Sequence, residues 1–278
     1  MTRQYLVIGD PIAHSRSPLI YNTLFSYYGL DARYSTLQVP AGAISQMLPQ
    51  LRQLAGFNIT MPHKRAILPF LATISSAAKA AQSVNTVKVD CDGSLHGHST
   101  DGEGFARALQ AAGRSFAQSN VVLLGAGGAA EAAAWRAVME ARCLTIAARS
   151  VEKAATLCKR VASCSRCTVT PAAIDQLPLE TLQQCDVFIN ATPQGMVNHP
   201  FFPNLDFLHH LRPGAIICDM VYEPARTHLL LQAERLGFPT MPGLPMLLWQ
   251  ALIAFEIFTG VHPDQSAFAR VQQAICSK

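Results

Sequence analysis

Strand-like and helix-like runs alternate along almost the whole chain, and this alternation restricts the fold more than any other property. Strands are expected at residues 4–9, 33–39, 56–60, 86–89, 120–124, 143–148, 167–170, 186–190 and 215–219. Helices are expected between most of them, for example at 17–28, 101–112, 127–140, 151–161 and 225–236. Because alternating strands and helices form βαβ units, the pattern predicts the α/β class with largely parallel sheets.

The length of 278 residues favours about two domains. One break is expected at 99–101, where a new βαβ series follows a hairpin that turns at Asp92-Gly93. A second is expected at 238–243, where Pro239, Pro242 and Gly243 cluster. The apolar helix expected at 246–258 must be buried in protein, so it should return to the first domain. We therefore predict one domain from 1–101 with 243–278, a second from 102–242, and a ligand cleft between them.

Composition and charge exclude several classes of protein. No stretch of about 18 uncharged apolar residues appears, and the first strand is too short for a secretory signal, so we expect a cytoplasmic protein without a membrane span. The net charge of +4 comes from scattered basic residues, which argues against nucleic-acid binding. Cys164 with Cys167, and His96 with His98, each lack further ligands nearby, so no metal site is expected.

A glycine-rich turn between a strand and a helix is the clearest chemical motif. It reads Gly125-Ala126-Gly127-Gly128-Ala129 and follows the apolar strand at 120–124. The glycines allow a tight turn and close approach of a pyrophosphate, and the helix N-terminus offers free N–H groups to it. The alternative is a tight turn without a ligand, but the surrounding βαβ unit favours a Rossmann-type, doubly wound dinucleotide-binding domain.

The end of the next strand indicates which dinucleotide is preferred. NAD sites commonly carry an acid there for the ribose hydroxyls, but this chain has Arg149 next to the strand and Lys153 one helical turn later. A guanidinium suits a 2′-phosphate, which an acid would repel. The sequence therefore predicts NADP, although a solvated surface arginine is the alternative.

Polar residues after the strands of the first domain are candidates for a substrate site. Ser15 and Ser17 can direct both hydroxyls to one side and bind a carboxylate, or Ser17 before Pro18 can simply cap a helix. Lys64 is expected in the first turn of a helix, where it would oppose the dipole, and this favours a functional role. Asp101 can act at the site or cap the helix that follows it.

These motifs, read in order, resemble the shikimate dehydrogenase family. They are GDPIAHSRSP, FNITMPHK, VNT, STDGEG, LLGAGGAA, INATPQGM, CDMVYEP and GLPMLLWQA, and they extend from Gly9 to about Gly260. The resemblance implies two α/β domains and NADP-linked interconversion of 3-dehydroshikimate and shikimate, a step toward aromatic amino acids.

The resemblance also implies roles for individual residues. Lys64 and Asp101 would be the catalytic pair, with Lys64 as the acid–base group. Substrate would be bound by Ser15, Ser17, Thr60, Asn85, Tyr222 and Gln250. The cofactor would be lined by Gly125, Ala126, Gly127, Gly128, Ala129, Arg149, Ser150, Lys153, Met220 and Gly243, with Thr192 and Met196 near the nicotinamide.

Several positions depart from the family's usual residues. Ser99 and Ala148 each stand where Asn is common, Ser150 where Thr is common, and Lys153 where a second Arg is common. Pro245 stands where Gly is usual; it fixes φ and removes an N–H, so the start of the last helix is expected to differ.

Two other functions compete with this interpretation. One is an NAD-using or dual-cofactor quinate/shikimate dehydrogenase, against which Arg149 and the paired serines argue. The other is a non-catalytic ligand-sensing homologue, against which the presence of both Lys64 and Asp101 argues. We expect a monomer or a homodimer.

Overall fold

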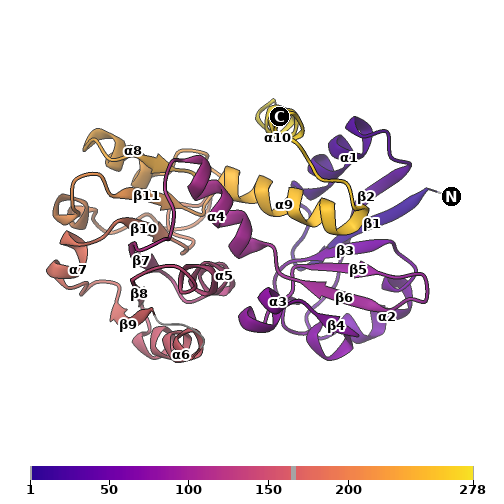
Figure 1. The fold of residues 1–278 in the computed structure, drawn as a ribbon, viewed down its shortest axis with the longest axis horizontal. Helices are drawn as coiled ribbons and strands as arrows, with labels where there is room; N and C mark the ends of the chain where they lie inside the picture. Colours follow the sequence, from indigo (N-terminus) through magenta and orange to yellow (C-terminus); the bar gives the residue numbers. More distant parts are fainter. Residues whose placement is uncertain (1, 164–166, 278) are drawn as a thin grey trace. The chain divides into compact units, whose positions relative to one another are not determined.

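A computed structural model describes residues 2–163 and 167–277, and Figure 1 shows its fold. The chain forms two compact units. The first contains the chain up to Thr100 and again from Leu248 onward, and the second runs from Asp101 to Leu247. The predicted ranges placed the boundaries at 101/102 and 242/243, whereas the second boundary of the units lies inside a helix, α9 (Gly243–Thr259).

The first unit is built on a mixed sheet with the strand order β2-β1-β3-β5-β6-β4. Strands β1 to β3 are parallel, whereas β5 runs antiparallel to both β3 and β6. The end of β3, the start of β5 and the end of β6 therefore share one edge with the end of β1. The strands are β1 (Arg3–Gly9), β2 (Ala32–Gln38), β3 (Gly56–Ile59), β4 (Thr73–Ile74), β5 (Thr86–Val89) and β6 (Leu95–His98).

Helices cover both faces of this sheet. Leu6 and Ile8 face a core completed by residues of α2 and α3, among them Ile44, Leu51 and Ala78. On the other face, Tyr5 contacts the rings of Phe25 and Phe258, which come from α1 and α9. The helices are α1 (Ser17–Tyr27), α2 (Ile44–Leu51), η1 (Leu68–Phe70), α3 (Ser76–Ala81) and α10 (Gln265–Cys276), together with the C-terminal part of α9. The C-terminal helices thus pack on the first unit, as predicted.

The second unit contains a sheet with the order β12-β11-β10-β7-β8-β9, in which the neighbouring strands described are parallel. This is the doubly wound order, with its switch point between β7 and β10, where ligands usually bind. The predicted fold class is confirmed. The strands are β7 (Asn120–Leu124), β8 (Cys143–Ala148), β9 (Thr168–Ala173), β10 (Val187–Asn190), β11 (Ile216–Asp219) and β12 (Thr240–Met241).

Helices on opposite faces of this second sheet bury alternate residues of its strands. Val122 and Leu124 belong to a core shared with α7, η2 and α8. The other face packs against α5 and α6, which contact β7, β8 and β9. The helices of this unit are α4 (Asp101–Ala111), α5 (Gly128–Ala137), α6 (Val151–Ala162), α7 (Leu179–Gln183), η2 (Asp206–His210) and α8 (His228–Arg235).

One local expectation is wrong: Lys64 is not in a helix. Residues 61–67 form turns that lead into η1, because Pro69 lacks the N–H that a continuing helix would need. Pro245 lies in the first turn of α9, where N–H groups have no partner within the helix, and whether the start of this helix differs from that of the family stays a prediction. The hairpin expected at Asp92-Gly93 is formed by the antiparallel strands β5 and β6, and β5 is also antiparallel to β3.

Within residues 2–163 and 167–277, no helix has the length and apolar character needed to cross a membrane.

Candidate active site

The glycine-rich turn joins β7 to α5 at the switch point of the second sheet. Gly125 has φ +115°, and a Cβ there would lie 2.9 Å from the Ala191 oxygen, so only glycine fits. At Gly127 and Gly128, by contrast, a Cβ would meet no atom of the described chain within 4 Å. Open space therefore lies before the first turn of α5. This space and the free amides of that turn fit a pyrophosphate.

The turn after β8 carries two exposed cations. Arg149 follows the strand directly, and Lys153 lies in the first turn of α6. The Ser150 Oγ accepts a hydrogen bond from the Lys153 backbone N at 3.3 Å and donates one to Glu152 Oε2 at 2.8 Å. This hydrogen bond lowers the pKa of Glu152. Two cations and one anion leave the turn with one excess positive charge, which fits a phosphate.

The loops after β10 and β11 hold the other predicted cofactor residues. Thr192 donates its hydroxyl to Asn190 Oδ1 at 2.6 Å, and Met196 is 43% exposed although it is apolar. Met220 follows β11, and a Cβ at Gly243 would lie 2.5 Å from the Met220 oxygen. Because the strands are parallel, these loops lie at the same sheet edge as the glycine-rich turn.

Asn85 is the centre of a polar cluster at the shared edge of the first sheet. Its Nδ2 donates to Thr100 Oγ1 at 2.9 Å and lies 3.5 Å from Gln250 Oε1. The Thr100 backbone N in turn donates to Asn85 Oδ1 at 2.9 Å. The structure thus brings together two residues far apart in the sequence, Asn85 and Gln250, that were predicted to bind one substrate.

Sequence reasoning missed the buried residues behind this cluster. Asn58 Nδ2 donates to Thr86 Oγ1 at 3.0 Å, and Thr86 Oγ1 donates to Asn85 Oδ1 at 3.2 Å. The Tyr34 hydroxyl donates to Asn58 Oδ1 at 2.6 Å and also interacts with Ser17. A continuous chain of polar contacts therefore joins Ser17 to Asn85. The one local signal was Asn58, a polar residue inside an otherwise apolar strand.

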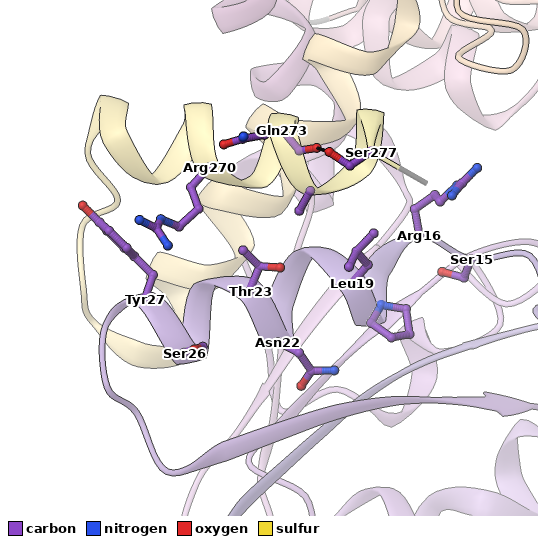
Figure 2. Close-up of a pocket in the computed structure, with 12 residues that line it drawn as sticks. Ser15, Arg16, Leu19, Asn22, Thr23, Ser26, Tyr27, Arg270, Gln273 and Ser277 are labelled. Carbon is purple, nitrogen blue, oxygen red and sulfur yellow. Dashed lines mark hydrogen bonds between the residues drawn. The ribbon is translucent and has the colours of Figure 1, made fainter.

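The predicted serine pair begins α1. Arg16 has the N-cap position, and Ser15 Oγ accepts from the Ser17 backbone N at 3.3 Å, so the alternative that Ser17 caps the helix is wrong. Ser15 also lines a groove of about 900 Å³ between α1 and α10, shown in Figure 2. The Arg270 guanidinium in this groove lies over the Tyr27 ring at 5.1 Å.

The turn that carries Lys64 is tied to its surroundings by backbone and side-chain contacts. The Lys64 oxygen accepts from the Val84 backbone N at 2.9 Å, next to Asn85. The buried His63 ring has Nε2 2.6 Å from the Val39 oxygen, so Nε2 carries the hydrogen and donates it. Thr60, at the start of the turn, packs against Gly9, where a Cβ would lie 2.4 Å from Thr60 Cγ2. The backbone at Lys64 is therefore held in place within the first unit.

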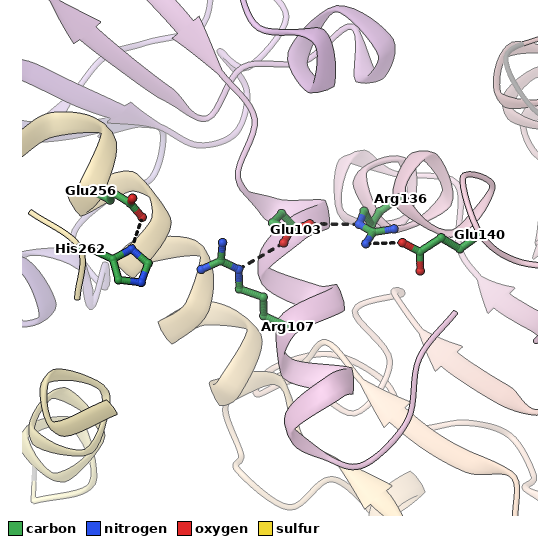
Figure 3. A network of polar contacts seen from close by, with 6 residues as sticks. All are labelled: Glu103, Arg107, Arg136, Glu140, Glu256 and His262. Carbon is green, nitrogen blue, oxygen red and sulfur yellow. Dashed lines mark hydrogen bonds and ion pairs between the residues drawn. The ribbon is translucent and has the colours of Figure 1, made fainter. Parts of the chain in front are cut away.

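Asp101 is the first residue of α4 and of the second unit. Thr100 therefore occupies the position before the helix, which is where an N-cap residue would lie. Glu103, in the same turn as Asp101, accepts from Arg107 Nε at 3.2 Å and from Arg136 Nε at 3.1 Å (Figure 3). The first ion pair lies within α4, and the second joins α4 to α5. Lys64 and Asp101 belong to different units, and their pairing stays a prediction.

Models of protein families match most of the chain. The shikimate dehydrogenase substrate-binding domain matches residues 7–87, shikimate/quinate 5-dehydrogenase matches 107–199, and the shikimate 5'-dehydrogenase C-terminal domain matches 243–271. The shikimate dehydrogenase (NADP+) of Alkaliphilus metalliredigens is 37% identical over 269 residues, which cover 93% of this chain and 92% of that protein.

The chain belongs to the shikimate dehydrogenase family.

Solved structures of this family have the same fold. Shikimate 5-dehydrogenase from Thermus thermophilus, in complex with NADP(H) and shikimate, is 30% identical with a TM-score of 0.83, covering 98% of this chain and 99% of that one. Quinate dehydrogenase from Corynebacterium glutamicum, in complex with NAD, is 29% identical with a TM-score of 0.90, covering 100% and 99%. The resemblance expected from the motifs is confirmed.

The residues at which this chain departs from the family's usual pattern lie at the ends of elements. Ala148 ends β8 and Ser99 follows β6.

Among the described residues, no group of three or more His, Cys, Asp or Glu side chains could hold a metal ion. Cys164, of the pair Cys164 and Cys167, lies outside the described residues.

Proposed function

We propose that this chain is an NADP-dependent shikimate dehydrogenase, which reversibly reduces 3-dehydroshikimate to shikimate in the synthesis of aromatic amino acids. The observation that carries this is similarity over the full length to proteins of that name, including one solved with NADP(H) and shikimate. The predicted monomer or homodimer and the cytoplasmic location stay predictions.

We assign substrate binding mainly to the polar edge of the first sheet. Ser15 and Ser17 would bind the carboxylate, while Thr60, Asn85 and Gln250, with Tyr222 from the second unit, would bind the hydroxyls. Two contacts support this assignment, because a residue held at both its backbone and its side chain keeps one orientation: Asn58 donates to the Asn85 backbone oxygen, and the Thr86 hydroxyl donates to Asn85 Oδ1. Thr100, bonded to Asn85 twice, would help to hold it.

We assign the cofactor to the carboxyl edge of the second sheet. Gly125, Ala126, Gly127, Gly128 and Ala129 would surround the pyrophosphate, and Arg149, Ser150 and Lys153 the 2′-phosphate. Thr192, Met196, Met220 and Gly243 would lie near the nicotinamide. The open space at Gly127 and Gly128 and the absence of an acid at residues 148–150 support NADP. When bound, NADPH supplies the hydride.

The chemistry of the chain's own residues is proton transfer and charge stabilisation. Reduction of a ketone builds negative charge on its oxygen, and a positioned ammonium can stabilise that charge and donate a proton to it. We assign this role to Lys64. Asp101 would orient the ammonium and a substrate hydroxyl.

The assignment of Lys64 is tested by Lys64→Ala. Loss of the proton donor should lower kcat by about 10²–10⁴-fold with a similar KM for shikimate, measured by NADPH absorbance with purified protein. Lys79→Ala is the control, because Lys79 is an exposed lysine of the same unit in α3. Near-normal turnover of Lys64→Ala would exclude the role.

The main rival is an NAD-using or dual-cofactor quinate/shikimate dehydrogenase, as the quinate relative illustrates. Four rates separate the two: NADP and NAD, each with shikimate and with quinate. We expect the NADP–shikimate pair to be fastest. A faster rate with quinate and NAD would replace the proposed function with the rival.

A further inference from the structure

Asp219 is a fully buried carboxylate at the carboxyl end of β11, with 0% exposure. Its Oδ1 accepts from Asn190 Nδ2 at 2.9 Å and from the Val221 backbone N at 3.0 Å. Its Oδ2 accepts from Thr227 Oγ1 at 2.6 Å. These partners are neutral donors, and burial raises the pKa of Asp219. A buried carboxylate is costly, so its place at a ligand-binding edge calls for a functional reason.

The carboxylate organises the loop that follows its own strand. The bond to Val221 fixes the backbone between Met220 and Tyr222, and the bond to Thr227 fixes the far end of the same loop at the N-cap of α8. Asp219 therefore holds both ends of the segment that carries two predicted site residues.

Asp219 also reaches the loop after β10 through its neighbour in the sheet. Asn190 pairs with Asp219 in register and is itself fully buried. While its Nδ2 donates to Asp219, its Oδ1 accepts from both the backbone N of Thr192, at 3.0 Å, and the Thr192 hydroxyl. The bond to Asp219 thus sets the orientation of the amide that holds Thr192.

Further backbone contacts join the two loops and the start of α9. The Val197 backbone N donates to the Glu223 oxygen at 3.2 Å, and the Gly243 backbone N donates to the Val221 oxygen at 3.3 Å. All four residues assigned to the nicotinamide side therefore belong to segments tied, directly or through one neighbour, to a single side chain.

We infer that Asp219 is a positioning residue for the nicotinamide half of the cofactor, acting through Asn190, Val221 and Thr227. This inference rests on the proposed function. A carboxylate suits the role because both oxygens only accept, whereas an amide in its place would present an NH₂ group to one of the donors. The adenosine half, assigned to the turns after β7 and β8, does not depend on these bonds.

The test is Asp219→Asn, which keeps the size of the side chain. Binding of NADP+ and of adenosine 2′,5′-bisphosphate, which lacks the nicotinamide half, is measured by calorimetry on the full chain. Loss of a hydrogen bond to a charged group predicts an increase of about tenfold or more in the Kd for NADP+. The Kd for the bisphosphate should stay within about twofold, because its binding residues keep their partners.

Asp186→Asn is the matched control. Asp186 precedes β10, at the opposite edge of the sheet, where it accepts from Arg212 at 2.6 Å and from the Asn120 backbone N at 2.8 Å. Its loss removes a carboxylate of the same unit without touching the loops, so both Kd values should match the wild type. Should Asp219→Asn not fold, Thr227→Val and Thr227→Ser replace it: the valine should weaken NADP+ binding selectively and the serine should not.

Three outcomes would overturn the inference. If Asp219→Asn binds NADP+ with an unchanged Kd, the carboxylate does not position the residues that bind the nicotinamide half. If the Kd values for NADP+ and for the bisphosphate rise equally, Asp219 has a general role in the fold of the second unit. Failure of the wild type to bind either ligand refutes the proposed cofactor site, and the inference with it.

Discussion

At the scale of single residues, the clearest chemical information lies where strands end. Arg142 precedes β8 and Arg149 follows it, and both side chains are exposed. They lie at opposite edges of the parallel sheet. Because dinucleotides bind at the carboxyl edge, only Arg149 is expected to contact the 2′-phosphate of NADP.

Arg149→Ala should therefore raise the KM for NADP and leave the KM for NAD almost unchanged. A charge-assisted hydrogen bond contributes about 1.5–3 kcal/mol, which corresponds to roughly 10–150-fold in KM. Initial rates with each cofactor measure the effect, and Arg142→Ala is the control. An equal rise for both cofactors would show that Arg149 supports the turn rather than the phosphate.

At the scale of elements, β6 illustrates how a strand that carries polar residues is built into a core. Leu95 and Gly97 are buried, while His96 and His98 alternate with them and are half-buried. Burial, followed by the nearby positive charges of His96 and Lys88, lowers the pKa of His98 below its ordinary value of 6.5. The ring therefore favours the neutral form in the folded protein.

This lowered pKa makes stability depend on pH in a defined direction. The unfolded chain binds the His98 proton more tightly, so His98 leaves stability unchanged well above pH 6.5 and reduces it as the pH falls below that value. The loss is at most about 1.4 kcal/mol per pH unit for one proton. Urea unfolding at pH 7.5, 6.5 and 5.5 should show that His98→Asn loses less stability on acidification than the wild type.

His209→Asn, which replaces an exposed histidine in η2, is the control for that experiment. It should follow the wild type at all three pH values. If the free energy of unfolding changes with pH equally in the wild type and in His98→Asn, the pH dependence does not come from His98.

At the scale of the whole molecule, burial separates six of the cysteines that the structure describes into an exposed and a protected class. Cys91 and Cys276 are exposed, whereas Cys158, Cys167, Cys185 and Cys218 are buried. Burial raises the pKa of Cys158 and Cys167 to about 11 and that of Cys185 to about 12. Since the thiolate is the reactive form, these thiols are protected both because reagents cannot reach them and because they stay protonated.

Alkylation of the folded protein by iodoacetamide at pH 8, followed by peptide mass spectrometry, should label Cys91 and Cys276 at least about tenfold faster than Cys185 and Cys218. Unfolding in urea should remove the difference, since the ordinary pKa and free access return together. Equal rates in the folded protein would mean that the core opens locally far more often than its packing indicates.

Much of the fold could be predicted from the sequence because its signals are local. The strands at 86–89, 120–124 and 143–148 have the predicted bounds, since each is a short run rich in apolar or β-branched residues. The short helix α2 was not named among the expected helices, because its internal Pro49 argues against a helix interior. The glycine-rich turn was recognisable because its backbone geometry requires glycine at a fixed distance from a strand and a helix.

The chain's own sequence thus decided the order of its elements, the α/β class and the polar residues that follow each strand, because these depend on neighbours within a few positions. Only the tertiary structure decided that β5 pairs with β3, that Asn58 contacts Thr86, and that Asp219 links two loops. The bonds from Asn58 to Thr86 and from Asn190 to Asp219 join residues that are 28 and 29 positions apart, and no local pattern encodes them. A buried polar residue takes its role from the partners that packing brings to it, and those partners exist only in the folded chain.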